Sequence, residues 1–244
     1  MPKLMDSMED LQTTSNYGFS AVKMDDLGAS EYTLVTITAD VSTSVSAFKD
    51  DLEKCLKTIL ESCQKSPREE NLMIRLVSFN HGLQELHGFK LLNSIDESDY
   101  DGILNCTGMT ALYDAVYSSI EATQHYGAIL NNQDYMANAI IFVITDGCDN
   151  SSSYTPSSVK QIIGETIKNE DLESVSVVLV GVGDDPYTID ELDRFQSNAD
   201  INQFVKIGEA TPGKLAKLAE FISQSISSTS QSLGSGSASA PLTF

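Results

Sequence analysis

The chain has 244 residues, of which 41% are hydrophobic and 20% are charged, a balance typical of a globular domain with a substantial core. Its 35 acidic residues outnumber its 15 basic residues, and the net charge of −20 disfavours binding to nucleic acids and to anionic lipid headgroups. No apolar run reaches the roughly 18 to 20 residues of a membrane span. Cations and basic protein surfaces are the natural counterparts of such a charge, although solubility alone also explains it.

The first segment, residues 1–30, is polar and rich in methionine, and we expect it to be an extension of the domain that follows. It has one early lysine and lacks the apolar core of a secretory signal peptide, which predicts a cytoplasmic location. Cysteines stay reduced in that compartment. None of the four forms a CxxC pair, so we expect all of them to be packing residues: Cys55, Cys63, Cys106 and Cys148.

Apolar runs rich in β-branched residues predict buried strands along the rest of the chain. They cover residues 32–39, 71–79, 137–145 and 174–182, with a shorter run at 203–207. Residues 81–93 are expected to form an antiparallel extension that pairs with the strand before it. Helical spacing of apolar residues runs from Val45 to Cys63. Three later helices are expected to begin at a capping residue followed by proline: Thr155-Pro156, Asp185-Pro186 and Thr211-Pro212.

Strands and helices alternate, which predicts an α/β fold with a Rossmann-like, doubly wound sheet and helices on both faces. We expect a mostly parallel sheet of about six strands, one of them an antiparallel edge strand. The domain is predicted to cover residues 31–226. Residues 227–244 are rich in serine and glycine and are expected to be a flexible tail. Ligands of such sheets bind at the carboxyl ends of the strands, so the residues just after each strand are the best candidates for a functional site.

Five oxygen-bearing side chains occupy such positions. Asp40 ends the first strand and is followed by Ser42 and Ser44, Thr110 precedes a helix, and Asp146 follows the strand at 137–145. Hard oxygen ligands without histidine or cysteine favour Mg²⁺, Mn²⁺ or Ca²⁺ over zinc or copper. Neutral hydroxyls among the ligands would leave the cation able to accept a further anionic oxygen. Alternatively, these residues cap a helix and form a turn; Ser42 and Ser44 also stand where a helix N-terminus needs acceptors.

The motif D-x-S-x-S at 40–44, Thr110 before a helix and T-D-G at 145–147 resemble the von Willebrand factor A (vWA) domain with its metal-ion-dependent adhesion site (MIDAS). The resemblance covers roughly residues 30–226. It implies that Ser42, Ser44 and Thr110 are hydroxyl ligands, and that Asp40 and Asp146 bind the ion directly or through water. It also implies that a carboxylate from a protein partner fills the free position. Thr43 stands where many members have glycine, so the loop is expected to be stiffer or differently shaped.

We therefore expect a non-catalytic, divalent-metal-dependent protein interaction module that recognises an Asp or Glu side chain of a partner. Resemblance to intracellular bacterial members adds an AAA+ ATPase or a stress-response assembly as a candidate partner. Family resemblance also implies that the metal site can be coupled to a shift of the last helix, residues 211–229. The alternative is a metal-dependent hydrolase or phosphotransferase with Asp40 as nucleophile. Such enzymes usually carry a second acid at the position of Ser42 and a lysine near that of Asp146, and the sequence has neither.

Other motifs are weaker. The run at 180–186 has two glycines but Pro186 in place of a third, which argues against a dinucleotide site. Residues 97–102 mimic the start of an EF-hand loop but lack its closing glutamate, so we expect a solvated acidic loop. The three histidines accompany no nucleophile at hydrolase spacing. Three further residues are candidates for the surroundings of the metal site: Tyr113, Asp114 and Asp149.

Overall fold

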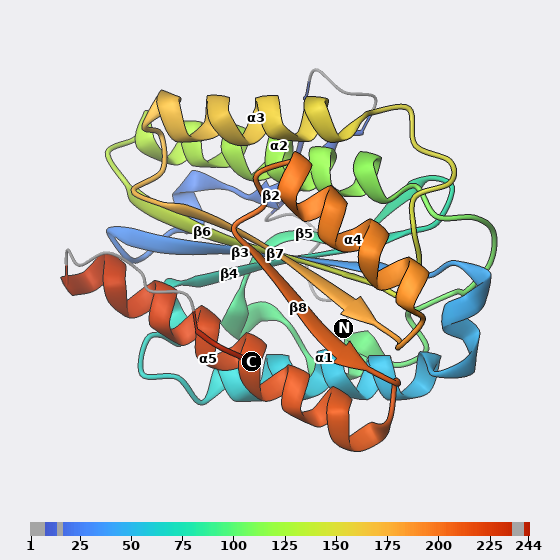
Figure 1. Ribbon diagram of the computed structural model, residues 1–244. Helices are drawn as coiled ribbons and strands as arrows, with labels where there is room; N and C mark the ends of the chain where they lie inside the picture. The colour runs from blue at the N-terminus through green and yellow to red at the C-terminus, as the bar shows by residue number, and fades with distance from the viewer. Residues whose placement is uncertain (1–7, 14–16, 236–241) are drawn as a thin grey trace.

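The computed structural model describes residues 8–13, 17–235 and 242–244. In this part of the chain one sheet of eight strands is covered by helices on both faces, as Figure 1 shows. The α/β, Rossmann-like architecture predicted from the sequence is confirmed. None of the described helices is long and apolar enough to cross a membrane.

The strands lie in the order β1-β2-β5-β4-β3-β6-β7-β8. Their bounds are β1 Met8–Leu11, β2 Phe19–Val22, β3 Glu31–Asp40, β4 Leu72–Phe79, β5 Leu83–Leu91, β6 Met136–Thr145, β7 Val175–Val182 and β8 Gln203–Gly208. The central strand β3 pairs in parallel with β4 on one side and with β6 on the other. The chain therefore reverses its direction of progress across the sheet beside β3, and this is where doubly wound sheets bind ligands.

Among the described residues, five α-helices complete the layers: α1 Lys49–Gln64, α2 Leu112–Asn131, α3 Pro156–Asn169, α4 Pro186–Asn198 and α5 Pro212–Ser235. Helices α1 and α5 cover one face of the sheet, and α2, α3 and α4 cover the other (Figure 1). The predicted helix starts at the three prolines are confirmed. Thr155 and Asp185 cap their helices by accepting a hydrogen bond from a backbone N–H three residues later.

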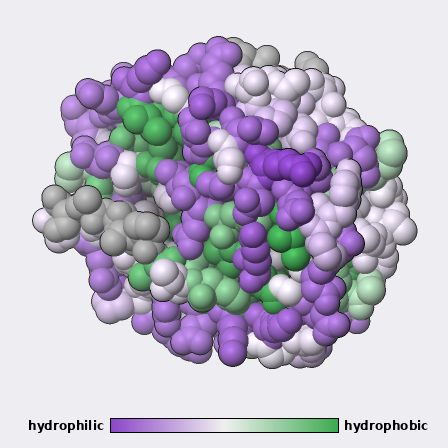
Figure 2. Space-filling view, viewed as in Figure 1, coloured by the Kyte–Doolittle hydropathy of each residue, from purple (hydrophilic) through white to green (hydrophobic). Residues whose placement is uncertain are grey.

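The core lies on both faces of the sheet because neighbouring side chains of a strand point to opposite faces. On β7, Val178 and Val180 belong to the cluster packed under α1 and α5, whereas Val177 and Leu179 belong to the one under α2, α3 and α4. The face drawn in Figure 2 is mostly hydrophilic; one hydrophobic patch lies near the middle, where β8 lies between α4 and α5, and another lies at the upper left. Nearly continuous apolar strands are thus explained by burial on two sides.

The N-terminal segment differs from expectation. The described part of the sheet has eight strands rather than about six, because β1 and β2 come from the segment expected to be an extension. As a result, β5 pairs antiparallel with β4 as expected but is not an edge strand, since β2 lies on its other side. A Cβ atom on Gly88 would lie 1.9 Å from the carbonyl oxygen of Ser20, so glycine permits this close approach. Ser20 also donates from its backbone N–H and its hydroxyl to Glu85.

The C-terminal segment differs as well. Helix α5 continues to Ser235, so residues 227–235 are helical and not the flexible tail expected from their composition. The Ser232 hydroxyl donates to the Thr229 carbonyl at 2.7 Å, and Asn138 on β6 donates to the same carbonyl at 2.7 Å. These bonds and burial against the sheet outweigh the low helix propensity of serine. The proposed domain boundaries at residues 30 and 226 stay predictions.

Candidate functional site

Asp40 is the last residue of β3, and its carboxylate is held by two donors from different segments. The side chain is only 1% exposed. Its Oδ1 accepts from the Ser42 backbone N–H at 2.7 Å, and its Oδ2 accepts from the Thr145 hydroxyl at 2.7 Å. The parallel register of β3 with β6 brings Asp40 beside Thr145. The ends of the two strands are therefore joined through this acid.

Ser42 and Ser44 extend this network towards solvent. Their hydroxyl oxygens lie 3.1 Å apart, and the Ser44 hydroxyl donates to Oδ1 of Asp146 at 2.8 Å. Ser42 is buried, whereas Ser44 is exposed and lies at the opening of the cluster. The two serines and both aspartates predicted from the sequence are thus brought together at one edge of the sheet.

The predicted capping role of these serines is wrong. A short 3₁₀ helix, Thr43–Ala47, precedes α1, and neither it nor α1 has a side-chain cap. The 3₁₀ turn satisfies itself through the Val45 N–H, which donates to the Ser42 carbonyl at 3.2 Å. The hydroxyls are consequently free of the helix and point to each other and to Asp146. Helix capping therefore does not explain why serines stand at these two positions.

Thr110 lies just before α2, as expected, and is 4% exposed. Its Oγ1 lies 3.8 Å from the point where a Cβ on Gly147 would be, which places it beside the residue after Asp146. Its backbone forms a reciprocal pair with Asn150: the Thr110 N–H donates to the Asn150 side chain at 2.8 Å, and the Asn150 N–H donates to the Thr110 carbonyl at 2.9 Å. The Thr110 and Asp146 loops are thereby fixed to each other.

Sequence reasoning missed three positioning residues: Asn80, Thr145 and Asn150. Asn80 follows β4 directly and holds the Thr110 loop at two points. Its side chain donates to the Thr107 carbonyl at 2.9 Å, and its carbonyl accepts from the Ala111 N–H at 2.6 Å. Asn80 directly follows the end of β4, the same signal that revealed Asp40 and Asp146, whereas Asn150 lies five residues after the end of β6. Thr145 was part of the T-D-G motif, but its partner depends on strand register.

The three residues proposed for the surroundings of the site, Tyr113, Asp114 and Asp149, have different roles in the structure. Asp149 accepts from the Tyr113 N–H at 3.3 Å and so supports the start of α2 beside Thr110. The Asp114 carboxylate accepts from the backbone N–H groups of Ser153 and Tyr154, so it holds the loop after the site instead of facing the cluster. The Tyr113 ring packs against Phe195 on α4, with ring centres 4.5 Å apart. None of the three is hydrogen-bonded to a candidate ligand; Asp149 supports the first turn of α2, which follows Thr110.

The electrostatics of the cluster favour a cation. Burial raises the pKa of Asp40 to about 6, partly offset by hydrogen bonds from Thr145 and Ser42, and the negative charge of Asp146 raises it further. Burial also raises the pKa of Asp146. Neither acid forms an ion pair with any lysine, arginine or histidine in the described ranges. Two neighbouring carboxylates without a basic partner leave an unbalanced negative charge that a bound cation would neutralise.

The donor set fits a hard divalent cation. It consists of two carboxylates and three hydroxyls, all with oxygen donors: Asp40, Ser42, Ser44, Thr110 and Asp146. Across the described residues, no group of three or more His, Cys, Asp and Glu side chains has an arrangement that could hold a metal. A cation at this edge would therefore depend on the hydroxyls as well as on the acids. Such a mixed oxygen set is suited to Mg²⁺, Mn²⁺ or Ca²⁺.

The other sequence motifs have structural roles. Asp185 in the run at 180–186 caps α4. The acidic loop forms a 3₁₀ helix, Glu97–Tyr100, capped by Asp96. His87 is buried and hydrogen-bonded between Tyr100 and the Gly88 carbonyl.

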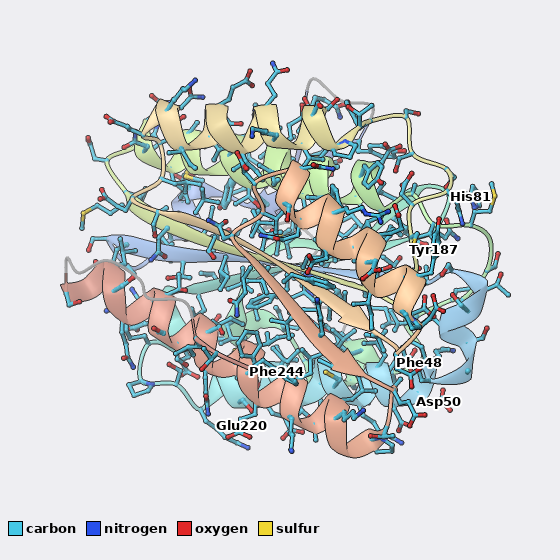
Figure 3. The ribbon with its side chains drawn as sticks, viewed as in Figure 1. Phe48, Asp50, His81, Tyr187, Glu220 and Phe244 are labelled. Carbon is cyan, nitrogen blue, oxygen red and sulfur yellow. The ribbon has the colours of Figure 1, made fainter. Side chains whose placement is uncertain are left out.

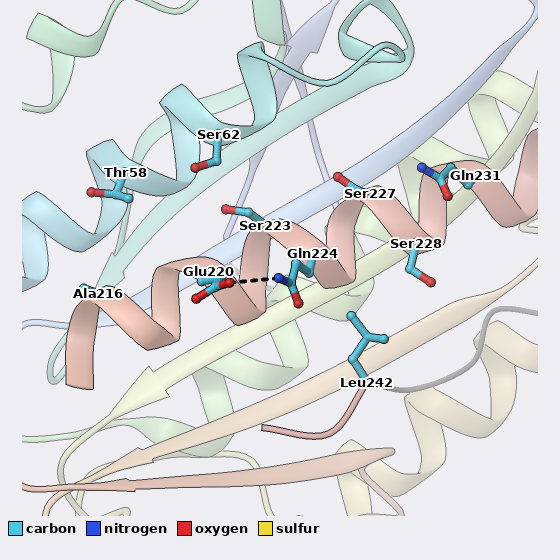
Figure 4. Close-up of a pocket in the computed structure, with 10 residues that line it drawn as sticks. All are labelled: Thr58, Ser62, Ala216, Glu220, Ser223, Gln224, Ser227, Ser228, Gln231 and Leu242. Carbon is cyan, nitrogen blue, oxygen red and sulfur yellow. Dashed lines mark hydrogen bonds between the residues drawn. The ribbon is translucent and has the colours of Figure 1, made fainter. Parts of the chain in front are cut away.

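A pocket of about 580 Å³ lies between α1 and α5, away from the strand ends (Figure 4). Its lining consists mainly of hydroxyl and amide side chains from both helices, together with Leu242. Gln203 donates to the Leu242 carbonyl at 2.8 Å, which connects the last described residues to β8. None of the five candidate ligands contributes to this lining, so the pocket is distinct from the candidate cation site.

No protein-family model matches the chain, and no curated protein matches it in sequence. Solved structures do match. A point mutant of the PilB minor pilin from Streptococcus sanguinis aligns with a TM-score of 0.59 and 15% identity, over 85% of this chain and 64% of that one. The pilus adhesin SpaC from Lactobacillus rhamnosus GG aligns with a TM-score of 0.58 and 12% identity, over 91% of this chain and 33% of that one.

A third match is proximal thread matrix protein 1 from the mussel byssus, solved with zinc in its MIDAS motif. It aligns with a TM-score of 0.53 and 17% identity, over 80% of this chain and 46% of that one. The chain thus spans between a third and two-thirds of the length of these proteins. At such identities the likeness establishes the fold alone. The chain has the Rossmann-like α/β fold expected from its sequence and shares it with a protein that carries a MIDAS motif.

Proposed function

We propose that this chain is a vWA-like domain whose strand-end cluster binds a divalent cation, and that the cation binds a carboxylate of a partner protein. The observation that carries the proposal is the hydrogen bond from Ser44 to Asp146, which are 102 residues apart in the sequence. Together with the Thr145–Asp40 bond, it joins two loops and the ends of two strands into one set of oxygens. A fold does not require acids without a basic partner to converge with hydroxyls in this way, whereas a cation site does.

The burial of the candidate ligands leaves one side of the cation site open to solvent. Asp40 and Ser42 are buried beneath the cluster, whereas Ser44 is exposed and Asp146 is partly exposed. A cation held from below by these residues would present its remaining coordination positions to solvent. Since three of the five protein ligands are neutral, it would keep enough positive charge to attract an anionic oxygen. An Asp or Glu side chain of a partner supplies such an oxygen.

A binding role suits Asp40 better than a nucleophilic one. Both of its carboxylate oxygens accept hydrogen bonds, and its side chain is almost fully buried, which restricts the approach of a substrate. We therefore propose a non-catalytic function. An AAA+ ATPase or a stress-response assembly as partner, and a cytoplasmic location, stay predictions from the sequence resemblance.

The first test is binding of Mg²⁺, Mn²⁺ and Ca²⁺ measured by isothermal titration calorimetry. We expect wild type to bind at least one of them with one site, and Asp146→Ala to lose this binding while circular dichroism shows an intact fold. Asp50→Ala is the matched control, because Asp50 is an exposed acid at the start of α1 outside the cluster. Equal cation affinity of wild type and Asp146→Ala would contradict the site.

The second test concerns the partner. Immobilised wild type and Asp146→Ala are exposed to a lysate of the source organism in Mg²⁺ or in EDTA, and captured proteins are identified by mass spectrometry. We expect one or more proteins to be captured by wild type in Mg²⁺ only. Mutation of a single acidic residue of the captured protein should then abolish binding. A partner that binds Asp146→Ala, or binds wild type in EDTA, with full affinity would contradict the proposed function.

A further inference from the structure

The loops around the candidate cation site contain neither lysine nor arginine. They connect the elements at the carboxyl ends of the parallel strands and cover residues 41–48, 80–82, 105–111, 146–155, 183–185 and 209–211. Beyond Asp146 of the cluster they carry four further acids: Asp149, Asp184, Asp185 and Glu209. Lys49, which begins α1 next to the first loop, is paired with Glu53 at 3.9 Å. Lys214, in the first turn of α5, lies beside Glu209, with its Nζ 2.7 Å from the point where a Cβ on Gly208 would be. The other loops therefore carry a negative charge that they do not balance themselves.

This charge creates a conflict with the proposed ligand. A partner carboxylate must approach through a negative field before the cation attracts it at short range. The conflict is resolved if the partner carries positive charges beside its acidic residue, because these meet the acids of the loops. Complementary charge of this kind raises the association rate and excludes partners of the wrong sign. A run of several acidic residues would be repelled by the same field.

Large apolar side chains also border the site. Met109 is 54% exposed and Tyr187 is 68% exposed, although burial is the rule for such residues in the described chain. Met109 lies between Gly108, whose carbonyl accepts from the Thr43 N–H, and Thr110, which pairs with Asn150. It therefore sits where the Ser44 loop and the Asp146 loop meet.

Tyr187 borders the other side of the Asp146 loop. It is adjacent to Thr188, whose side chain lies beside the Cys148 thiol, two residues after Asp146. In Figure 3, Tyr187 and His81 lie at the end of the molecule where Phe48 marks the loop after β3. Exposed apolar side chains next to a polar anchor point are typical of protein-binding surfaces.

We propose that the partner presents a single acidic residue flanked by a basic residue and a large apolar residue in one exposed segment. The acid binds the cation, the basic residue faces Asp184 and Asp185, and the apolar residue packs on Met109 and Tyr187. This inference rests on the proposed function, since it specifies the surroundings of the carboxylate that the cation binds. Charge complementarity selects this occupant over an acidic segment or a second copy of this chain, which itself carries a net charge of −20.

A display library of nine-residue peptides with a fixed central Asp tests the proposal. The peptides are selected on the wild-type chain in Mg²⁺ and eluted with EDTA. We expect the eluted peptides to be enriched in Arg or Lys and in Leu, Ile or Phe next to the Asp, and depleted of further Asp and Glu. Eluted peptides with no such bias, or with acidic flanks, would overturn this inference and leave the proposed function standing. No EDTA-eluted peptides from a chain that binds Mg²⁺ would overturn both.

Two pairs of variants assign the preference to the named residues. For an enriched peptide, Asp184→Lys should weaken binding on the order of fivefold at low salt and much less at high salt, because salt screens exposed charges. The control is Glu173→Lys, the same exposed charge change just before β7 at the opposite edge of the sheet. Met109→Ser should weaken binding by about the same factor, with Ile167→Ser on α3, 58% exposed, as its control. Equal losses in variant and control would overturn the assignment.

Cation binding separates these effects from damage to the site. Asp184 and Met109 are not among the candidate ligands, so calorimetry should give both variants the cation affinity of wild type. A peptide affinity that falls only together with cation affinity would mean that the variants disturb the cluster, and the proposed recognition surface would be wrong.

Discussion

The edge of the sheet that holds the candidate site and the part of α5 from Ser223 onward are both rich in serine and threonine. Their hydroxyls, however, have different kinds of partner. On α5, the Ser223 hydroxyl donates to the Ala219 carbonyl at 2.7 Å and the Ser225 hydroxyl to the Phe221 carbonyl at 2.8 Å, each within one turn of the same helix. At the edge, the Ser44 hydroxyl donates to Asp146, a charged group on a distant segment. The partner of a hydroxyl, and not its abundance, distinguishes structural serines from candidate functional ones.

The difference has an energetic basis. A serine that bonds to its own helix needs no other residue and can be replaced at small cost. A hydroxyl that faces a poorly compensated carboxylate stabilises a charge that the fold itself does not require. Substitutions at the two regions should therefore separate stability from cation binding.

The largest expected effect comes from Asp40→Asn, which keeps the shape of the side chain and removes its charge. Cation affinity should fall at least about 100-fold, because an acid of the donor set is lost.

Burial raises the pKa of Asp40 from 3.8 to about 6, so the ionised carboxylate destabilises the cation-free fold. This penalty is fully present above pH 6 and is relieved as the pH falls towards 3.8. The variant should thus gain up to about 3 kcal/mol in urea unfolding at pH 7 in EDTA. An unchanged cation affinity would contradict a site at this edge.

A buried polar pair that belongs to neither region should produce a pH effect of similar size. His87 is hydrogen-bonded to Tyr100 and to the Gly88 carbonyl, and burial lowers its pKa from 6.5 to about 4. Below pH 6.5 the unfolded chain binds a proton that the folded chain takes up only near pH 4, so stability falls across this window as the pH falls. His87→Gln should remove up to about 3 kcal/mol of that loss, measured as urea midpoints at pH 7 and pH 4.5.

His81→Gln is the matched control for this pH effect, because His81 is exposed. Identical pH slopes for wild type and His87→Gln would show that His87 is not the group responsible. The effect should be the same in Mg²⁺ and in EDTA, since His87 is not a candidate ligand.

A direct comparison of the two regions uses one serine from each. Ser44→Ala should lower cation affinity about tenfold while changing the unfolding free energy by about 0.5 kcal/mol or less. Ser223→Ala on α5 should leave cation affinity unchanged and change the unfolding free energy by about 1 kcal/mol or less, because its bond is made within the helix. The comparison fails if Ser223→Ala lowers cation affinity, or if Ser44→Ala leaves it intact.

The smallest expected effect concerns Thr43, which stands where the vWA pattern often has glycine. Its backbone N–H and its hydroxyl both donate to the Gly108 carbonyl at 3.2 Å, so it connects two loops of the site. Thr43→Gly should cost about 0.5 to 1 kcal/mol through lost bonding and greater freedom of the unfolded chain. Cation affinity should fall by no more than about threefold. Thr43→Ser, which keeps the hydroxyl, should lie close to wild type in both measurements.

Much of the fold follows from patterns visible in the sequence. The strands β3, β4, β6, β7 and β8 were predictable because they are long or distinct apolar runs. The starts of α3, α4 and α5 were predictable because a capping residue is followed by proline. The four-residue strand β2 was not, because its place depends on contacts with β5, among them the close approach of Ser20 to Gly88. The end of α5 was not predictable either, since its serine-rich turns depend on Asn138 and on burial against the sheet.

Part of the candidate site was likewise predictable from the sequence, and part of it was not. Strand ends and residue chemistry were enough to name the five candidate ligands, four of which are joined by direct or shared hydrogen bonds. The role of Thr145 depends on the register of β3 with β6, which the sequence does not reveal. The capping interpretation of Ser42 and Ser44 was wrong because a 3₁₀ helix that contains Ser44 precedes α1, and neither helix has a side-chain cap.

The backbone bonds between the loops have a consequence for the order of events in binding. The Thr107 N–H donates to the Val41 carbonyl at 2.7 Å, and the Thr43–Gly108 and Thr110–Asn150 bonds connect the remaining segments. These bonds involve no cation, so the oxygens are brought into place when the chain folds. The ordering entropy is then spent before the ion arrives, which is preorganisation. Amides of Thr43, Thr107 and Asn150 should accordingly resist hydrogen exchange in EDTA as well as in Mg²⁺.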